Sequence, residues 1–299
     1  MRFLRPLLSC VCAALLLAGC ANTAPLTPLP EWQSPEGREA ARLGQIVELA
    51  TGRVLTPQQL VGQLAGTPRL LIGERHDNPD HHALQRWLLE NLAAREAYGS
   101  LLLEMLDPAQ QARVEATRAA LARGETPELP AALAWQPGWD WAQYGALVDW
   151  ALRQPAPLLA ANLDREEIRR IYREVPPLAG ERSTAAAVSG SLLAQIRASH
   201  CDRLPESQLP AMLAVQQQRD RRMAERLLDA PAPAVLIAGA FHVRRDLGVP
   251  LHLADLDVAA AVQVLLLAEA GEQVAPGSAD YVWYTPAVAA VDHCAQWPR

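Results

Sequence analysis

Four short apolar runs, each followed at once by polar residues, indicate the fold of this chain. They cover residues 69–72, 101–103, 157–160 and 234–238. None alternates between apolar and polar positions, which is typical of strands covered on both faces, and each follows a segment with a helical pattern. Strands that alternate with helices predict an α/β fold, with a mostly parallel central sheet flanked by helices. Ligands of such sheets bind at the rim formed by the carboxyl ends of the strands.

Capping patterns mark where several helices begin. Thr56 with Pro57 opens a helix that should end near Gly66, and Asn78-Pro79-Asp80 opens another. Asp164 followed by Glu167 is a capping-box pattern for a helix through Arg173. Residues 209–228 form a further helical pattern, and the strand-like runs at 262–268 and 280–286 predict an antiparallel edge.

A helical insertion is expected at about residues 108–154, forming a lid over the carboxyl rim of the sheet. Its central part carries Trp135, Trp139, Trp141 and Tyr144 within ten residues. If Asp140 caps a helix, then Trp141, Tyr144 and Val148 share one face. The alternative is that these aromatic side chains only fill the core.

The amino terminus has the features of a bacterial lipoprotein signal. A charged start and a short apolar stretch lead to Leu17-Ala18-Gly19-Cys20, which resembles a lipobox. We therefore expect a signal peptide at 1–19, a lipidated Cys20 with a palmitate-type acyl chain, and an extended proline-containing tether over 20–37. One domain would follow at 38–299, anchored to a membrane of the cell envelope, with the outer membrane facing the periplasm as the expected site. The alternative is an ordinary cleaved signal peptide.

The charged residues exclude several classes of function. All 27 basic residues are arginine, which excludes a phosphate-loop lysine and Schiff-base chemistry. The net charge is −6, and loss of Arg2 and Arg5 with the signal would make it −8. A nucleic-acid partner is therefore not expected.

Two of the five cysteines remain for the folded domain. Cys10 and Cys12 would leave with the signal, and Cys20 would carry lipid. In an oxidising compartment, Cys201 and Cys294 are expected to form a disulfide. Free buried thiols are the alternative, and a metal pair is disfavoured because neither has a nearby cysteine.

The strand ends carry the candidate chemistry. Glu74 and His76 follow the first strand, Glu104 follows the second and His242 follows the last, with Asn162 expected nearby. Two carboxylates and two imidazoles can bind a divalent transition metal such as zinc or manganese, or act as an acid and base pair. The simpler interpretation is that they satisfy loop amides. Of the adjacent His81 and His82, at most one can face such a site, because they diverge by about 100° on a helix.

These motifs resemble the ChaN-like family of haem-binding bacterial lipoproteins, over about residues 40–290. The motifs are Gly73-Glu74-Arg75-His76-Asp77-Asn78-Pro79 with Gln85, Leu102-Leu103-Glu104-Met105, Gln217-x-x-Asp220-x-x-Met223-Ala224 and Gly239-Ala240-Phe241-His242-Val243. The resemblance implies an α/β fold, haem held between two subunits of a homodimer, a tyrosine iron ligand assisted by histidine, and a role in haem and iron uptake. A haem receptor or transport system would be a further partner.

The resemblance points to Tyr144 as the iron ligand, with Trp141, His76 and His242 as further haem-binding residues. Tyr98, Tyr172, Tyr281 and Tyr284 stay open as alternatives. The wider superfamily, which includes the Tiki proteases and erythromycin esterases, implies another function, a metal-dependent hydrolase using Glu74, His76, Glu104 and His242. A scaffold with a vestigial site is the third possibility.

Overall fold

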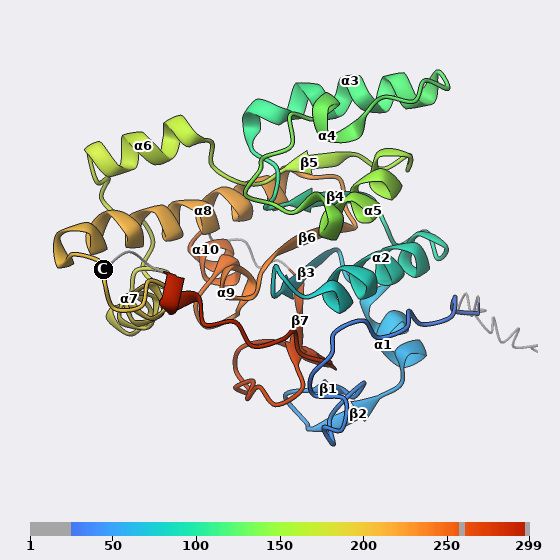
Figure 1. The fold of residues 1–299 in the computed structure, drawn as a ribbon, viewed down its shortest axis with the longest axis horizontal. Coiled ribbons are helices and arrows are strands. Elements are labelled where there is room, and N and C mark those ends of the chain that lie inside the picture. The colour runs from blue at the N-terminus through green and yellow to red at the C-terminus, as the bar shows by residue number, and fades with distance from the viewer. Residues whose placement is uncertain (1–24, 257–260, 297–299) are drawn as a thin grey trace, which may run out of the picture.

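The computed structural model describes residues 25–256 and 261–296. The predicted signal peptide with Cys10 and Cys12, the lipidation site Cys20 and the first residues of the tether lie outside the described residues. The fold is an eight-stranded sheet with helices on both faces (Figure 1). Along the sheet the strand order is β2-β1-β8-β7-β3-β6-β4-β5. The strands are β1 (Ile46–Glu48), β2 (Arg53–Leu55), β3 (Arg69–Glu74), β4 (Ser100–Leu103), β5 (Leu158–Ala160), β6 (Ala234–Gly239), β7 (Val262–Glu269) and β8 (Tyr281–Thr285).

The predicted mostly parallel sheet is confirmed, because strands β3 to β8 all pair with one another in parallel. The predicted antiparallel pairing of the last two strands is wrong, since Leu265 of β7 pairs with Tyr281 of β8 in parallel register. Residues 270–280 return the chain to the starting end of β7, about the dozen residues that a parallel connection needs. The antiparallel edge is instead made by β1, which pairs with β8 on one side and β2 on the other.

The helices are α1 (Pro57–Leu64), α2 (Pro79–Ala93), η1 (Pro108–Gln110), α3 (Gln111–Ala122), α4 (Leu129–Ala132), α5 (Trp141–Leu152), α6 (Arg165–Arg173), α7 (Ala186–Ser199), η2 (Glu206–Gln208), α8 (Leu209–Asp229), α9 (Ala240–Val243), α10 (Val249–Asp255) and η3 (His293–Gln296). The expected caps are present at Thr56, Asn78 and Asp164. No helix among the described residues is both long and apolar enough to cross a bilayer.

Both faces of the sheet are covered, as the unbroken apolar runs predicted. Leu70 and Ile72 of β3 join a core with α1, α2 and α5, whereas Leu71 joins a second core with α8 and α10. The two cores follow from the strand period of two, which sends successive side chains to opposite faces. The strand ends are therefore free to carry polar groups at the rim.

The insertion is helical, as predicted, and comprises η1, α3, α4 and α5. Asp140 caps α5, because its side chain accepts a hydrogen bond from the backbone N–H of Ala142 at 3.0 Å. Tyr144 and Val148 are buried in the core, and Trp141 is half-buried beside them. Most of this aromatic face is thus packed against the rest of the fold.

Edge strand β5 has its outer backbone groups occupied by one side chain. The Gln111 side-chain carbonyl accepts a hydrogen bond from the Ala160 N–H at 2.8 Å. The Gln111 side-chain amide donates to the Leu158 carbonyl at 3.1 Å. A single glutamine from α3 therefore pairs with the strand as a neighbouring strand would.

Residues 25–35 of the tether form no helix or strand, and they lie bound along α2. The Thr27 N–H donates to the Asn91 side chain at 3.1 Å, and the Trp87 indole N–H donates to the Thr27 carbonyl at 2.9 Å. At the other end, the backbone N–H groups of Gln33 and Ser34 donate to Asp80 at 2.6 and 2.9 Å. The domain therefore holds this segment well before residue 38.

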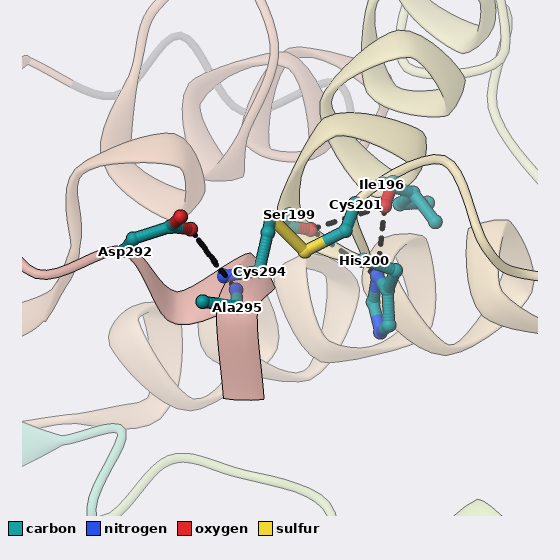
Figure 2. Close-up of a disulfide and its surroundings, with 7 residues drawn as sticks. All are labelled: Ile196, Ser199, His200, Cys201, Asp292, Cys294 and Ala295. Atoms are coloured by element: carbon teal, nitrogen blue, oxygen red, sulfur yellow. Dashed lines mark hydrogen bonds between the residues drawn. A yellow bond between two sulfur atoms is a disulfide. The ribbon is translucent and has the colours of Figure 1, made fainter. Parts of the chain in front are cut away.

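The predicted disulfide between Cys201 and Cys294 is confirmed. Figure 2 shows Cys201 directly after the end of α7, joined to Cys294 in the short carboxyl-terminal helix η3. The Cys294 backbone N–H also bonds to the Asp292 side chain at 2.9 Å. The bridge fastens the carboxyl-terminal segment to α7.

Candidate functional site

The structure brings the four strand-end residues together at the carboxyl rim. His76 Nδ1 lies 2.8 Å from Glu74 Oε1, and His76 Nε2 lies 3.8 Å from Glu104 Oε2. His242 Nε2 lies 3.3 Å from Glu104 Oε1. Asn162 is near them, because its side-chain amide donates to the Glu104 carbonyl at 2.8 Å. Residues far apart in sequence thus form one continuous polar site.

Gly239 makes this approach possible. It pairs with Glu74 in the parallel register of β3 and β6, and its N–H donates to Glu104 Oε2 at 2.8 Å. A methyl group added at Gly239 would lie only 2.7 Å from His76 Nε2. A side chain here would therefore occupy the place of the His76 ring.

Three further side chains surround Glu74. The Gln85 amide donates to Glu74 Oε2 at 2.5 Å, and the Tyr144 hydroxyl donates to Glu74 Oε1 at 2.6 Å. His82 Nδ1 lies 3.4 Å from Glu74 Oε2. Burial alone would raise the pKa of Glu74, but the His76 hydrogen bond and the charges of His82 and His76 outweigh it and lower the pKa to about 2. Glu74 is therefore a carboxylate at neutral pH.

The two adjacent histidines diverge, as predicted. His82 faces Glu74, whereas His81 points away and bonds to the Arg75 N–H at 2.9 Å and to the Thr285 hydroxyl at 3.0 Å. Burial lowers the pKa of His81 to about 3, so its imidazole is neutral. His81 has a structural role.

His242 is held between two carboxylates. His242 Nδ1 lies 2.5 Å from Asp220 Oδ1, on the opposite side of the ring from Glu104. Burial opposes protonation, but the charges of Glu104 and Asp220 outweigh it and raise the pKa of His242 to about 10. Asp220, on α8, had no role assigned from the sequence. Its only signal was its place in the Gln217-x-x-Asp220 motif.

Tyr144 reaches the site from α5, but its hydroxyl is buried beneath it. The residue is 1% exposed, and its hydroxyl lies 3.0 Å from His76 Nδ1 as well as close to Glu74. Burial and the Glu74 carboxylate both raise the pKa of the phenol. Tyr144 is thus a neutral donor that fixes Glu74 and His76 in position.

The other aromatic candidates lie elsewhere. Trp141 contacts Trp135, with ring centroids 5.1 Å apart, whereas Trp139 packs against His76 with tilted rings whose centroids are 4.9 Å apart. Tyr281 and Tyr284 are buried in β8, and Tyr98 is half-buried. Tyr172, on α6, is 42% exposed, and its hydroxyl contacts the Met212 sulfur.

A cleft of about 950 Å³ opens above these residues. Glu74, His76 and His242 line its base, Phe241, Leu266 and Val274 give it apolar surface, and Arg75 and Arg244 give it cations. No residue of 108–154 lines it, so the predicted lid does not cover this cleft. The insertion instead supports the rim from behind, through Tyr144 and Trp139.

Both cleft arginines are paired with carboxylates. The Arg75 guanidinium bonds to Asp77 at 2.9 Å and to Glu269 at 2.8 Å. The Arg244 guanidinium bonds to Asp246 at 2.6 Å and lies 5.7 Å from the Phe241 ring centroid. The pairs with Asp77 and Asp246 are partly exposed and weak enough to exchange for an anionic ligand group, whereas Glu269 is buried.

The donor set does not form a ready metal site. Over residues 25–256 and 261–296, no group of three or more His, Cys, Asp or Glu side chains is arranged to hold a metal ion. Imidazoles paired with carboxylates can instead take up and release protons, or present one ring nitrogen to a ligand.

Comparison with known protein families shows to which family the chain belongs. The family model described as "Haem-binding uptake, Tiki superfamily, ChaN" matches residues 60–253. The chain belongs to this family. The matched region includes all four strand-end residues, Asp220 and Tyr144.

A solved ChaN-family structure has the same fold. It is described as cofacial heme binding to ChaN of Campylobacter jejuni, with 28% identity and a TM-score of 0.73 over 84% of this chain and 98% of that chain. A toxin effector domain from Vibrio vulnificus and an erythromycin esterase have lower TM-scores of 0.45 and 0.44, at 14% and 12% identity. They cover 80% and 76% of this chain, and 39% and 76% of their own chains. Among curated protein sequences, none matches the chain.

Proposed function

We propose that this protein is a membrane-anchored haem-binding lipoprotein that serves haem and iron uptake. Its family membership supports this function, and the cleft is the observation that carries it. Haem requires apolar surface for its macrocycle, a side chain directed at iron and cations for its propionates. The cleft offers Phe241 and Leu266, histidines at its base, and Arg75 and Arg244, so its residues fit the group.

The iron ligand is either Tyr144 or His76. Tyr144 follows from the family resemblance, and a phenolate suits ferric haem, but its hydroxyl must first leave Glu74 and lose its proton. His76 already lines the cleft, Glu74 and Tyr144 hold its Nδ1, and its Nε2, 3.8 Å from Glu104 Oε2, is the nitrogen left for iron. A carboxylate behind a ligating histidine fixes its ring and raises its basicity.

A homodimer is part of the proposal. Phe241 lines the cleft together with Leu266 and Val274, and it is 39% exposed. A second subunit would cover this surface and the face of a bound macrocycle. Haem should therefore favour the dimer, which analytical ultracentrifugation with and without haemin would measure.

Haemin titration of the purified protein tests the function. We expect a Soret band that saturates at a fixed haem-to-subunit ratio, and its absence would exclude haem binding. Tyr144→Phe and His76→Gln separate the two ligands, since only the variant that lacks the ligand should change the iron coordination spectrum. Tyr172→Phe is the matched control, because it removes the exposed phenol and leaves the cleft intact. A change in that control alone would move the ligand to α6.

The second candidate function is a hydrolase. It is favoured by the row Asp220, His242 and Glu104, in which one imidazole bonds to a buried carboxylate on each side. Such a histidine can act as a general acid. Ester and peptide hydrolysis that is lost in Asp220→Asn, with haem binding retained, would support it; chelator treatment would show whether a metal takes part.

Membrane anchoring through Cys20 is proposed from the lipobox-like sequence, with the periplasmic face of the outer membrane as the location. Mass analysis of the mature amino-terminal peptide should show an acylated cysteine. A free amino-terminal residue other than Cys20 would refute the anchor.

A further inference from the structure

The segment from Thr27 to Ser34 runs antiparallel to α2 and is bound at both ends. Thr27 is fixed near the carboxyl-terminal end of α2, where Asn91 exchanges two hydrogen bonds with it, at 3.1 and 2.9 Å, and Trp87 adds a third. Ser34 is fixed near the amino-terminal end by Asp80, which is fully buried. We call this segment the clamp.

Helix α2 runs from the cleft rim to the opposite end of the sheet, where the parallel strands begin. It begins at Pro79, three residues after His76, and it ends at Ala93, on the side where the strands begin. From Asp80 to Asn91 the helix rises roughly 16 Å. Figure 1 shows the described chain starting at the right of the view, beside α1 and the end of α2, while α7 and α9 lie to the left. The chain therefore enters the domain at the end remote from the cleft.

We propose that the clamp orients the domain on its membrane, with α1 and the carboxyl-terminal end of α2 facing the bilayer and the cleft facing the aqueous side. The proposal rests on the lipidation of Cys20 put forward above. In this orientation a protein that delivers haem to the cleft, or takes haem from it, approaches from the aqueous phase. Haem does not pass directly between the cleft and the anchoring bilayer.

Chain length carries the argument. Thr27 lies seven positions after Cys20, so the leash between them reaches at most about 25 Å. A compact domain of this size has a radius of gyration of about 19 Å, hence a diameter of roughly 48 Å. A leash of half a diameter, attached at one end, cannot bring the opposite end to the bilayer.

Without the contacts of Thr27, the same chain would allow either orientation. The next backbone attachment is Gln33, whose N–H donates to Asp80 at 2.6 Å, near the amino-terminal end of α2 where the cleft rim lies. The thirteen positions from Cys20 to Gln33 would reach about 47 Å from an attachment beside the cleft, which is nearly the domain diameter. The contacts of Thr27 with Asn91 and Trp87 therefore determine whether the cleft can turn towards the membrane.

The test uses the full, processed lipoprotein in vesicles of phosphatidylethanolamine and phosphatidylglycerol that contain a headgroup-linked acceptor dye. A donor dye is attached at Ala94→Cys, beside the end of α2, or at Gln273→Cys, at the cleft; both positions are exposed. We expect at least fivefold more energy transfer from position 94 than from 273. Equal transfer from both positions would overturn the proposed orientation.

The clamp itself is tested by Asn91→Ala combined with Trp87→Phe, which should bring the two transfer efficiencies towards equality. The positive control is a thirty-residue Gly/Ser insertion after Thr23, which lengthens the leash and leaves every clamp contact intact. The role of the clamp would be overturned if the insertion made energy transfer from positions 94 and 273 equal while the clamp variant kept the original difference between them. Protein that fails to float with vesicles would overturn the anchoring, whereas haemin titration in solution reports separately on haem binding.

Discussion

At the scale of single residues, the site is one chain of hydrogen bonds from Tyr144 through Glu74 and His76 to the cleft. The four strand-end residues could be predicted from the sequence, because parallel strands end on one rim. Asp220 could not, since a carboxylate on a charged helix such as α8 shows no sign of which side chain it meets. Nor could the sequence show that the Tyr144 hydroxyl would be buried behind His76.

The protonation of His242 predicts how stability depends on pH. Its pKa is raised from 6.5 to about 10, so its contribution to stability is complete below pH 6.5 and is lost as pH rises through about 10. The unfolding free energy of the haem-free protein should therefore fall by a few kcal/mol over this interval. In His242→Gln this fall in unfolding free energy should be smaller. Part of it should remain, because the pKa of His76 is also raised in the folded protein. Parallel curves in urea denaturation would contradict this assignment.

Gly239 predicts a variant that damages the site and spares the fold. In Gly239→Ala the new methyl group would lie 2.7 Å from His76 Nε2 and 3.2 Å from His76 Cε1, too close for contact, so the ring must move. We expect haem affinity to fall about tenfold, equivalent to about 1.4 kcal/mol. Gly190→Ala is the matched control, since a methyl group there meets nothing within 4 Å. Equal affinities of the two variants in haemin titration would show that His76 does not contribute.

At the scale of helices and strands, local signals predicted boundaries well and pairing less well. The caps at Asp140 and Asp164 follow from short-range hydrogen bonds that a sequence pattern records directly. The direction of β8 depends on where residues 270–280 take the chain, and both an antiparallel hairpin and a parallel return fit an eleven-residue connection. Strands β1 and β2 were too short, at three residues each, to give a periodic signal.

The cap of α5 predicts a measurable stability change. Asp140→Ala removes the acceptor of the Ala142 N–H and should destabilise the protein by about 1 kcal/mol. Because α5 carries Tyr144, the spectrum of bound haem should also broaden. Asp149→Ala on the same helix is the control, as it removes only a surface pair with Arg153 and should change stability less. The reverse order in chemical denaturation would show that the cap does not stabilise α5.

At the scale of the whole molecule, long-range ties hold both ends of the described chain. The disulfide could be predicted because only two of the five cysteines follow the expected signal peptide and lipidation site. The binding of residues 27–34 to α2 could not, since Asn91, Trp87 and Asp80 are separated from that segment by 46 to 64 positions, and a proline-containing stretch gives no sign of its partner.

Removal of the disulfide should weaken the fold without altering the cleft. Cys201 and Cys294 are 93 positions apart, and opening a loop of this length should lower the unfolding free energy by about 4 kcal/mol. Thermal unfolding of Cys201→Ser with Cys294→Ser, compared with the oxidised parent, measures the change. The haem spectrum should be unaltered, because neither cysteine lines the cleft. A reduced parent that is as stable as the oxidised protein would contradict the prediction.

The glutamine at the β5 edge also limits how these molecules can associate. An exposed strand edge is a template on which further chains add, and the end state of such growth is an insoluble fibre. Because Gln111 occupies both the N–H of Ala160 and the carbonyl of Leu158, a second copy finds neither group available there. Self-association is thereby directed away from this edge: copies held on a membrane and paired around haem, as proposed above, would not polymerise through β5.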